Sequence, residues 1–347
     1  MPEFCTDVHA RGQERTQMNR TWDEDVKHEK NDELAMLSQV AHMYYDLGML
    51  QPEIAKALFF SRSKVSRMLQ KAQDVGIVEI KVKRYLSRMS SYERKLEETF
   101  GLKTAIVLNN YGDDRENSDE ALVNYAAMYI SGKLKGERIL GITGSHLVTK
   151  TVHKLKKVHE CNLKVVQTIG ATINHDISGD LVNYIAQTYD GKAYFLNTPV
   201  YVDDLYAKDV LLRDPAVTET FSLFRRCDLL LMGIGRFDLR GDMPLWFGYM
   251  TERHRQEMES KGAVGSICAM FYDINGQLLD SEWNRKCITI PWHDVANAGQ
   301  RIAIARGESK VKAILGALRG HLTDVLVTDM TTAAAVLEMQ SVLSVER

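Results

Sequence analysis

The sequence has little of several features that would define a class of protein. It holds only five cysteines in 347 residues, and these are scattered without a Cys-x-x-Cys pair. This usage argues against a disulfide framework and a zinc site, and it predicts reduced thiols in a cytoplasm. No apolar run approaches the ~20 residues that cross a membrane, and the polar, charged N-terminus does not resemble a secretory signal. We therefore expect a cytoplasmic protein without a membrane partner.

Motifs for metals and nucleotides are missing as well. The sequence contains neither His-Glu-x-x-His nor Gly-x-x-x-x-Gly-Lys-[Ser/Thr]. His146, His153 and His159 are seven and six positions apart, so they do not share one helical face at ligand distance. We therefore expect no metal and no cofactor.

Charge is unevenly distributed along the chain. With 45% hydrophobic and 26% charged residues the composition is that of a globular protein, and the length predicts two domains. The net charge is −2, yet residues 61–95 hold ten Lys and Arg against three Asp and Glu, a net +7 that leaves −9 for the remainder. A basic module on a mildly acidic body is expected when only one part of a protein meets nucleic-acid phosphates.

Residues 51–83 predict two short helices joined by a tight turn and followed by a basic β-ribbon. Pro52 suits the first turn of a helix, and Ser61 can cap the second helix. Together with a helix upstream (34–47), the strand at 77–83 completes the pattern of a winged helix-turn-helix. Four apolar residues of the second helix repeat at the spacing of a buried stripe: Val65, Met68, Leu69 and Ala72.

The face opposite this stripe contains Arg, Lys, Ser and Gln and no acid. Arg can fork onto guanine, and Lys and Ser can reach bases or phosphates in the major groove. The alternative is an ordinary amphipathic helix with a solvated basic face, but the neighbouring elements favour DNA binding. The residues predicted to contact DNA are Gln51, Ser61, Arg62, Ser63, Lys64, Ser66, Arg67 and Lys71, with Lys81 and Lys83 of the wing.

Composition also divides the chain into segments. Tyr92, Leu96 and Phe100 form a narrow apolar stripe on a linker helix, which either pairs with another chain or docks on its own body. We expect four segments: a flexible arm (1–30), the winged helix-turn-helix (31–86), the linker helix (87–101) and an effector-binding and oligomerisation domain (102–347).

From Thr104 onward, short strands that are apolar on both faces alternate with amphipathic helices. This alternation predicts an α/β domain with a mostly parallel sheet covered by helices. The expected strands are 104–108, 138–143, 163–169, 193–196, 228–234, 264–272, 301–305 and 324–328; the expected helices are 118–134, 145–157, 177–189, 203–213, 252–260, 309–319 and 330–340.

Glycine is common where these strands end, which is where ligands bind in such sheets. Gly141, Gly170 and Gly235 follow three of the strands, and Gly307 stands just before Lys310 at a helix start. Glycine lets a backbone approach a ligand, and helix N-termini present free N–H groups to anions. Each glycine alone can be explained by turn geometry. Together with the Lys310 ammonium they predict a site for a small anionic metabolite, such as a phosphorylated sugar.

Several runs of residues resemble one known family. Ser61-Arg-Ser-Lys-Val-Ser-Arg-Met-Leu is similar to the DNA-binding domain of the SorC family, bacterial sugar-responsive transcriptional regulators of the sorbitol-operon and deoxyribonucleoside type. The resemblance continues through Val165-Val-Gln-Thr-Ile-Gly, Asp228-Leu-Leu-Leu-Met-Gly-Ile-Gly, Gly262-Ala-Val-Gly, Phe271-Tyr-Asp-Ile-Asn-Gly, Gly307-Glu-Ser-Lys and Leu326-Val-Thr-Asp.

This resemblance implies a sugar-binding domain related in fold to glucosamine-6-phosphate deaminase and ribose-5-phosphate isomerase. It also implies self-association as a dimer or tetramer, and DNA affinity modulated by a sugar or sugar phosphate. The loops that match the family's effector site are 141–147, 170–176 and 265–269. The implied effector contacts are Gly141, Thr143, Gly144, Ser145, Gly170, Gly235, Gly265, Ser266 and Lys310.

Two departures from the family pattern fall at this expected pocket. Thr143-Gly144-Ser145 stands where the family often has Ser-Trp-Gly, and Ser266 stands where it frequently has an acid. The identity of the effector therefore does not carry over. His146 and His175 lie in the same loops, either as ligand contacts or as histidines without a role.

The sequence thus predicts a DNA-binding transcriptional regulator of a carbohydrate or polyol catabolic operon, not an enzyme. Its expected partners are double-stranded operator DNA, a sugar or sugar-phosphate effector and further copies of itself. The alternative is an enzyme like a sugar-phosphate isomerase or deaminase, which needs positioned acid–base groups. The acids near the expected pocket show no spacing that separates a catalytic pair from helix caps and turns: Asp176, Asp203, Asp204, Asp273 and Asp329.

Overall fold

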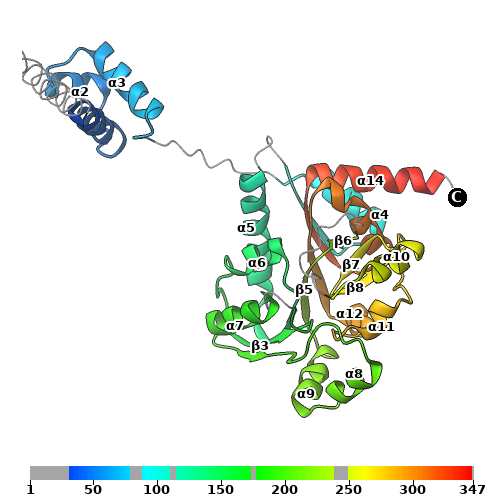
Figure 1. Cartoon of the computed structure of the whole chain (residues 1–347). Coiled ribbons are helices and arrows are strands. Elements are labelled where there is room, and N and C mark those ends of the chain that lie inside the picture. The colour runs from blue at the N-terminus through cyan, green and yellow to red at the C-terminus, as the bar shows by residue number, and fades with distance from the viewer. Residues whose placement is uncertain (1–30, 79–87, 110–114, 173–176, 238–248, 346–347) are drawn as a thin grey trace, which may run out of the picture. The chain divides into compact units, whose positions relative to one another are not determined.

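The chain divides into two compact units, Met1–Arg84 and Tyr85–Arg347 (Figure 1). Each unit has a hydrophobic core of its own. The computed structural model describes residues 31–78, 88–109, 115–172, 177–237 and 249–345.

The described part of the first unit is helical. A helix over 31–45 is followed by α2 (Gln51–Ala57) and α3 (Arg62–Asp74). Ser61 caps α3, because its Oγ accepts a hydrogen bond from the Lys64 backbone N–H at 3.2 Å. This arrangement confirms the helix-turn-helix, whereas most of the strand predicted over 77–83 falls outside the described residues. Buried side chains from all three helices form the core: Leu37, Val40, Ala41, Ile54, Ala55, Val65, Leu69 and Ala72.

The second unit is built on a seven-stranded sheet with the order β1-β10-β9-β5-β2-β3-β4, in which every neighbouring pair is parallel. The prediction of a mostly parallel sheet is confirmed. The strands are β1 (Thr104–Leu108), β2 (Gly136–Ile142), β3 (Cys161–Gln167), β4 (Lys192–Tyr194), β5 (Leu229–Gly233), β9 (Gln300–Ile304) and β10 (Val325–Asp329).

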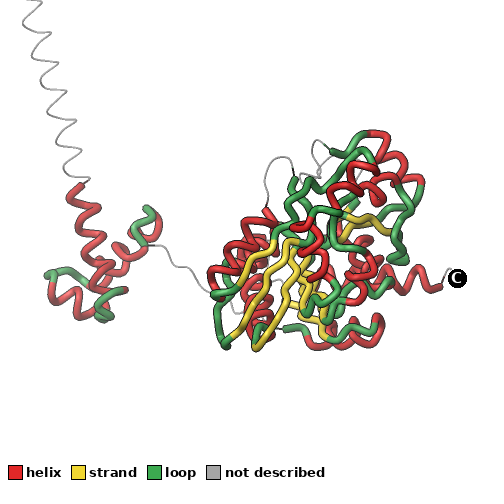
Figure 2. Tube along the Cα trace, turned by 90° about the horizontal axis from the view of Figure 1, so that it is seen from below, coloured by secondary structure: helices red, strands yellow, loops and turns green. Residues whose placement is uncertain are grey.

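Helices cover both faces of this sheet (Figures 1 and 2). Strand residues alternate between two cores; in β1, Ile106 faces one core and Val107 the other. The first core is closed by α5 (Arg115–Lys133), α6 (His146–Val152) and α7 (Ile177–Tyr189). The second is closed by α4 (Ser90–Phe100), α9 (Pro215–Phe224), α10 (Glu252–Ser260), α11 (Glu282–Lys286), α12 (Trp292–Asn297), α13 (Val311–Arg319) and α14 (Met330–Val345).

Two short helices complete the described part, α8 (Leu205–Leu212) and the 3₁₀ turn η2 (Glu308–Lys310). Among the described helices, none is long and apolar enough to cross a membrane.

The apolar stripe of the linker helix docks on the chain's own body. Leu96 and Phe100 of α4 are buried in the second core. Glu93 on the same helix is buried too, and its Oε1 accepts hydrogen bonds from Arg88 Nε at 2.7 Å and from the Val107 backbone N–H at 3.0 Å. A buried carboxylate needs such partners to offset the loss of water. Of the two interpretations open at the sequence level, docking is confirmed.

One predicted strand is a hairpin. Residues 264–272 form β7 (Gly265–Ile267) and β8 (Met270–Tyr272), which pair antiparallel in a second sheet with β6 (Gly235–Arg236). The turn residues Cys268 and Ala269 have φ values of +48° and +67°, which cost non-glycine residues about 1–3 kcal/mol each. The single-strand prediction is wrong because neither residue type signals a turn.

Candidate functional site

The basic face of α3 lies open to solvent. Its first turn holds no acidic residue. Lys71 differs from its neighbours because its ammonium pairs with Glu33 of the preceding helix, and Gln51 on α2 is half-buried. Lys81 and Lys83 lie outside the described residues. Every other predicted DNA contact is exposed: Ser61, Arg62, Ser63, Lys64, Ser66 and Arg67.

Contacts along α3 orient two of these side chains. Arg67 Nε donates to the Ser63 carbonyl at 3.4 Å, and the Lys64 ammonium lies 3.8 Å from the centroid of the Phe60 ring. Both contacts run toward the N-terminus of α3, the end of a recognition helix that meets base edges. The guanidinium has further donors that can fork onto guanine. The geometry therefore suits insertion of α3 into a major groove.

In the second unit, most of the predicted effector residues gather where the strand order reverses. From β2 the sheet runs one way to β3 and β4, and the other way to β5, β9 and β10. Because β2 and β5 are paired in parallel, the loops that follow them start side by side. Thr143–Ser145 follow β2, and Ile234–Arg236 lie after β5. Ligands of open α/β sheets bind at such a switch point, outside the carboxyl ends of the strands.

Two glycines allow close packing across this switch point. A Cβ atom on Gly233 would lie 2.5 Å from Ser145 Oγ, and one on Gly235 would lie 2.5 Å from Ser266 Oγ. Both distances are too short for real atoms, so a side chain at either position would displace its serine; at Gly233 the Ser145 Cβ, 2.7 Å away, would have to move as well. The loop after β5 is thereby held against the β2 loop on one side and against β7 on the other.

Thr143 connects three elements beneath the switch point. Its Oγ1 lies 2.5 Å from Thr168 Oγ1, just after β3, and 3.2 Å from Cys268 Sγ in the β7–β8 turn. Burial raises the pKa of the Cys268 thiol to about 11, so this sulfur stays protonated at neutral pH. Thr143 is itself buried, and it therefore shapes the floor of the site. Gly144 next to it is also buried, and its backbone N–H donates to Ser178 Oγ at 2.9 Å.

Lys310 reaches the same place from η2. Its Nζ donates to the Ile234 carbonyl at 2.8 Å. Burial lowers the pKa of Lys310, and the nearby Arg236 guanidinium lowers it further. In the described part of the chain no carboxylate forms an ion pair with this ammonium. A half-buried ammonium that contacts only a carbonyl can still bind an anion strongly.

Three of the predicted residues have packing roles. Gly141 lies inside β2 rather than after it, so its predicted place in a loop is wrong. At Gly265 a Cβ would lie 2.6 Å from Ala313 Cβ on α13. Gly170 is one strand further along, where a Cβ would lie 2.5 Å from the Pro199 carbonyl oxygen. These glycines hold the surrounding elements close together.

A charged cluster that the sequence did not reveal stands beside this site. Arg306, directly after β9, donates from Nε to Asp119 Oδ1 at 2.6 Å and from Nη1 to Asp329 Oδ2 at 3.2 Å. Lys150 Nζ and His146 Nε2 lie 3.4 and 3.5 Å from the other oxygen of Asp119. The cluster ties the ends of β9 and β10 to α5 and α6. The only feature of the sequence that could have indicated this cluster is the position of Arg306 near the end of a predicted strand.

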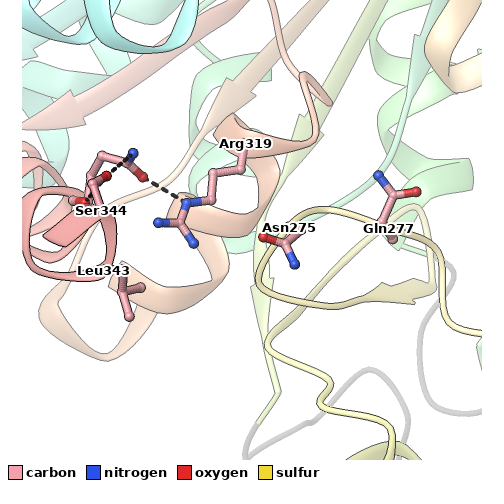
Figure 3. Close-up of a pocket in the computed structure, with 6 residues that line it drawn as sticks. Asn275, Gln277, Arg319, Leu343 and Ser344 are labelled. Carbon is pink, nitrogen blue, oxygen red and sulfur yellow. Dashed lines mark hydrogen bonds between the residues drawn. The ribbon is translucent and has the colours of Figure 1, made fainter. Parts of the chain in front are cut away.

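A separate groove lies away from these residues. It is lined by Asn275, Gln277, Arg319, Gln340, Leu343 and Ser344, with Arg319 Nε donating to Gln340 Oε1 at 2.7 Å (Figure 3). Arg319 ends α13, whereas Lys310 precedes its first residue, so the groove lies at the opposite end of that helix. It contains none of the predicted effector residues.

Gly233→Ala is expected to destabilise the second unit by about 1–3 kcal/mol, because overpacking forces Ser145 away. Ser145→Gly should cost only a few tenths of a kcal/mol, since glycine is tolerated at a helix N-cap. Thermal unfolding of both single variants and of the double variant measures the coupling. The double variant should be more stable than Gly233→Ala alone; strictly additive losses would contradict the packing described here.

The chain is similar to known proteins along most of its length. A family model described as "Putative sugar-binding domain" matches residues 84–338. The sorbitol operon regulator of Klebsiella pneumoniae is 27% identical over 315 residues, which cover 89% of this chain and 100% of that protein. The deoxyribonucleoside regulator of Bacillus subtilis is 28% identical over 304 residues, covering 86% and 96%.

The fold agrees with these sequence relationships. The crystal structure of the full-length sorbitol operon regulator SorC from Klebsiella pneumoniae matches with a TM-score of 0.69 at 26% identity, over 87% of this chain and 98% of that chain. The resemblance inferred from the motifs is confirmed. The chain belongs to the family of this sugar-binding domain.

Proposed function

We propose that the protein is a DNA-binding transcriptional regulator of a carbohydrate or polyol catabolic operon. A sugar or sugar phosphate bound at the β2–β5 switch point modulates its DNA affinity. The observation that carries the proposal is an exposed basic surface at the start of α3, with no acid in its first turn, on a unit separate from the sugar-binding domain. The relatives named above support it, since both are regulators. We place the protein in the cytoplasm, together with its operator.

On the DNA side, residues 62–67 of α3 enter the major groove. Arg62, Lys64 and Arg67 supply donors for guanine or phosphate, and Ser63 adds a short hydroxyl. The wing residues Lys81 and Lys83 hold phosphates in this proposal. Lys71 contributes less, because its ion pair with Glu33 must be broken before it can reach DNA.

On the effector side, the charge at the switch point favours an anion. Lys310 and Arg236 bring two positive groups to the loop after β5, because η2, which contains Lys310, contacts β6, which contains Arg236. A phosphate ester offers three acceptor oxygens to such donors. We therefore assign a sugar phosphate in preference to a neutral sugar.

Self-association as a dimer or tetramer is part of this proposal, because two linked helix-turn-helix units bind one operator more tightly than a single unit does. Helix α8 supports it: Leu205, Tyr206 and Val210 are exposed, and none of its eight residues is buried. An effector that prefers one assembly geometry then needs a coupling of only ~1–3 kcal/mol.

Among the residues that the structure describes, no observation favours the enzyme alternative. Asp203 pairs with Lys286, and Asp204 caps α8 by accepting from the Tyr206 N–H. Asp273 accepts from two backbone N–H groups of its own turn. Asp329 is held by Arg306, while Asp176 and His175 lie outside the described residues. The likeness to deaminase and isomerase folds stays a prediction.

The experiment that tests the function combines both sites. The full chain is used to select duplexes from a random-sequence pool, and sugars, polyols and their phosphates are then added to the selected complex. We expect one selected sequence family and a change in its affinity with a sugar phosphate. Sedimentation of the same chain should show more than one copy per particle. Failure to select any sequence, or rapid turnover of a sugar phosphate, would overturn the proposal.

A further inference from the structure

A single strained residue stands at the tip of the helix-turn-helix. Phe59 lies between α2 and the cap of α3, with φ at +55°. The Phe60 N–H donates to the Ala55 carbonyl at 2.8 Å, five residues back, which makes Phe59 the left-handed residue that ends α2. Glycine is the residue usually found at this position, because a Cβ atom is strained there.

The side chain of Phe59 is also almost fully exposed, at 96%. Its neighbour Phe60 packs against the core of the unit and lies under the Lys64 ammonium, so the two rings have different surroundings. In the described chain, Phe59 combines a left-handed backbone with a large exposed apolar side chain, and it is alone in doing so. Both features are unfavourable in the isolated unit, and no described contact offsets them. Strain of this kind persists mainly at functional positions.

The surroundings indicate what covers the ring. Ser61 caps α3 two residues later, and the exposed residues that follow are Arg62, Ser63 and Lys64, with no acid in the first turn. This surface is complementary in charge to DNA rather than to an apolar protein partner. Residues at the start of a recognition helix lie at the major groove, where the 5-methyl group of thymine is the apolar feature of the base edges.

We propose that Phe59 contacts DNA directly and packs its ring on a thymine methyl group at the edge of the site read by α3. This inference rests on the proposed DNA-binding function. In this proposal the uncharged Phe59 ring contributes to the preference for one DNA sequence over another. Its contribution is therefore independent of salt, unlike that of the neighbouring Lys and Arg side chains.

Phe59→Gly in the full chain tests the inference with the duplex that the wild-type chain selects. We expect roughly tenfold weaker binding, about the size of one base contact, with an unchanged dependence on salt. The melting temperature should not fall, because glycine relieves the left-handed strain. Leu47→Ala is the matched control, since Leu47 is 60% exposed on the same unit, and it should bind as the wild type does.

A second arm replaces thymine by uracil in the selected duplex. Wild-type affinity should fall, and Phe59→Gly should bind both duplexes equally. Equal binding of Phe59→Gly and wild type to the thymine duplex would overturn the inference and leave the proposed function standing. A change in the sedimentation of Phe59→Gly without DNA would assign the ring to a contact between copies and also overturn it. If the wild type selects no duplex, the proposed function itself fails.

Discussion

Replacing Lys64 and Arg67 together by alanine is expected to weaken operator binding between roughly 30-fold and 10⁴-fold. A base-edge contact in the major groove contributes about 1–3 kcal/mol, and two such contacts give about 2–6 kcal/mol. Both side chains are exposed on the basic face of α3, and both lean toward its N-terminus. Fluorescence anisotropy of the selected duplex at moderate salt measures the loss.

The stability of the variant needs to be known before this loss is assigned to DNA contacts. Removing Lys64 also removes its contact with the Phe60 ring, which is worth about 0.5–1 kcal/mol at an exposed site. Alanine is favourable at both helical positions, and Val65 and Leu69 keep the core intact. Circular dichroism should therefore show a folded protein with nearly unchanged helix content.

A matched control separates specific contacts from net charge. Lys135 and Lys192 are exposed on the second unit, so their double alanine variant loses the same two charges far from α3 in the sequence. It should bind DNA within about threefold of the wild type at moderate salt. If this control loses as much affinity as the α3 variant, or if the α3 variant binds normally, the groove assignment is wrong.

Salt dependence then distinguishes bases from phosphates. Each lost phosphate contact lowers the slope of log affinity against log salt by about one. Replacing Arg67 and Lys64 by alanine should change this slope little if the two side chains contact base edges rather than phosphates. A fall of about two would place both of them on the backbone, and sequence preference would then depend on Arg62 and Ser63.

The sequence predicts local features of the fold well, because their causes are local. The cap at Ser61 and the buried stripe of α3 depend on neighbours within one helical turn, and both were found where the pattern placed them. Runs of apolar residues predict the strands of the parallel sheet. Ligands of such sheets bind at the carboxyl ends of the strands, so a site was expected in loops such as those after β2 and β5, which the structure places side by side. The exact end of a strand is harder to predict: Gly141 was expected in the loop after a strand and lies inside β2.

Features held by distant contacts were not predictable. Arg306 and Asp119 are 187 positions apart in the sequence, so no local spacing of residues predicts their ion pair. The turn at Cys268 and Ala269 contains no glycine or asparagine. It is held by buried hydrogen bonds from Thr289 to the Cys268 carbonyl and from Trp283 to the Ala269 carbonyl. Tertiary contacts here override the local preference of the backbone.

Lys310→Met is expected to abolish most of the response to a sugar phosphate. A charge-assisted contact is worth about 1.5–3 kcal/mol, so the dissociation constant should rise by roughly 10- to 150-fold. A ligand at 100 times its dissociation constant stabilises the wild type by about 2.7 kcal/mol, but a 100-fold weaker variant by only about 0.4 kcal/mol. In a thermal-shift experiment this means about 5–10 °C for the wild type and about 1 °C for the variant.

Without ligand the same substitution should change stability little. Methionine has a similar length and removes the cost of holding a charge where burial has lowered the Lys310 pKa. It also removes the hydrogen bond to the Ile234 carbonyl, which leaves that oxygen without its donor. These two effects oppose each other. A ligand-free melting temperature within a few degrees of the wild type is therefore expected, so a lost response is not a folding defect.

The lowered pKa of Lys310 also predicts how binding depends on pH. In the ligand-free folded state this pKa lies below its ordinary value of 10.5. The charged form is thus disfavoured by folding; its cost is complete below the folded pKa and disappears as the pH rises past 10.5. A bound phosphate favours the charged form and keeps the proton in place. Affinity should be constant from pH 7 upward until it falls as the pH rises through the lowered pKa.

Lys312→Met is the control for both experiments, because Lys312 is an exposed lysine two residues further along the chain. It should keep the full thermal shift and the same alkaline decline as the wild type, whereas Lys310→Met should give a small response that does not vary with pH. A phosphate-induced shift that survives Lys310→Met would place the anion elsewhere on the unit. A shift that both sugars and their phosphates produce equally would show instead that the switch point recognises hydroxyl groups, and that the ammonium of Lys310 serves only to hold the loop after β5.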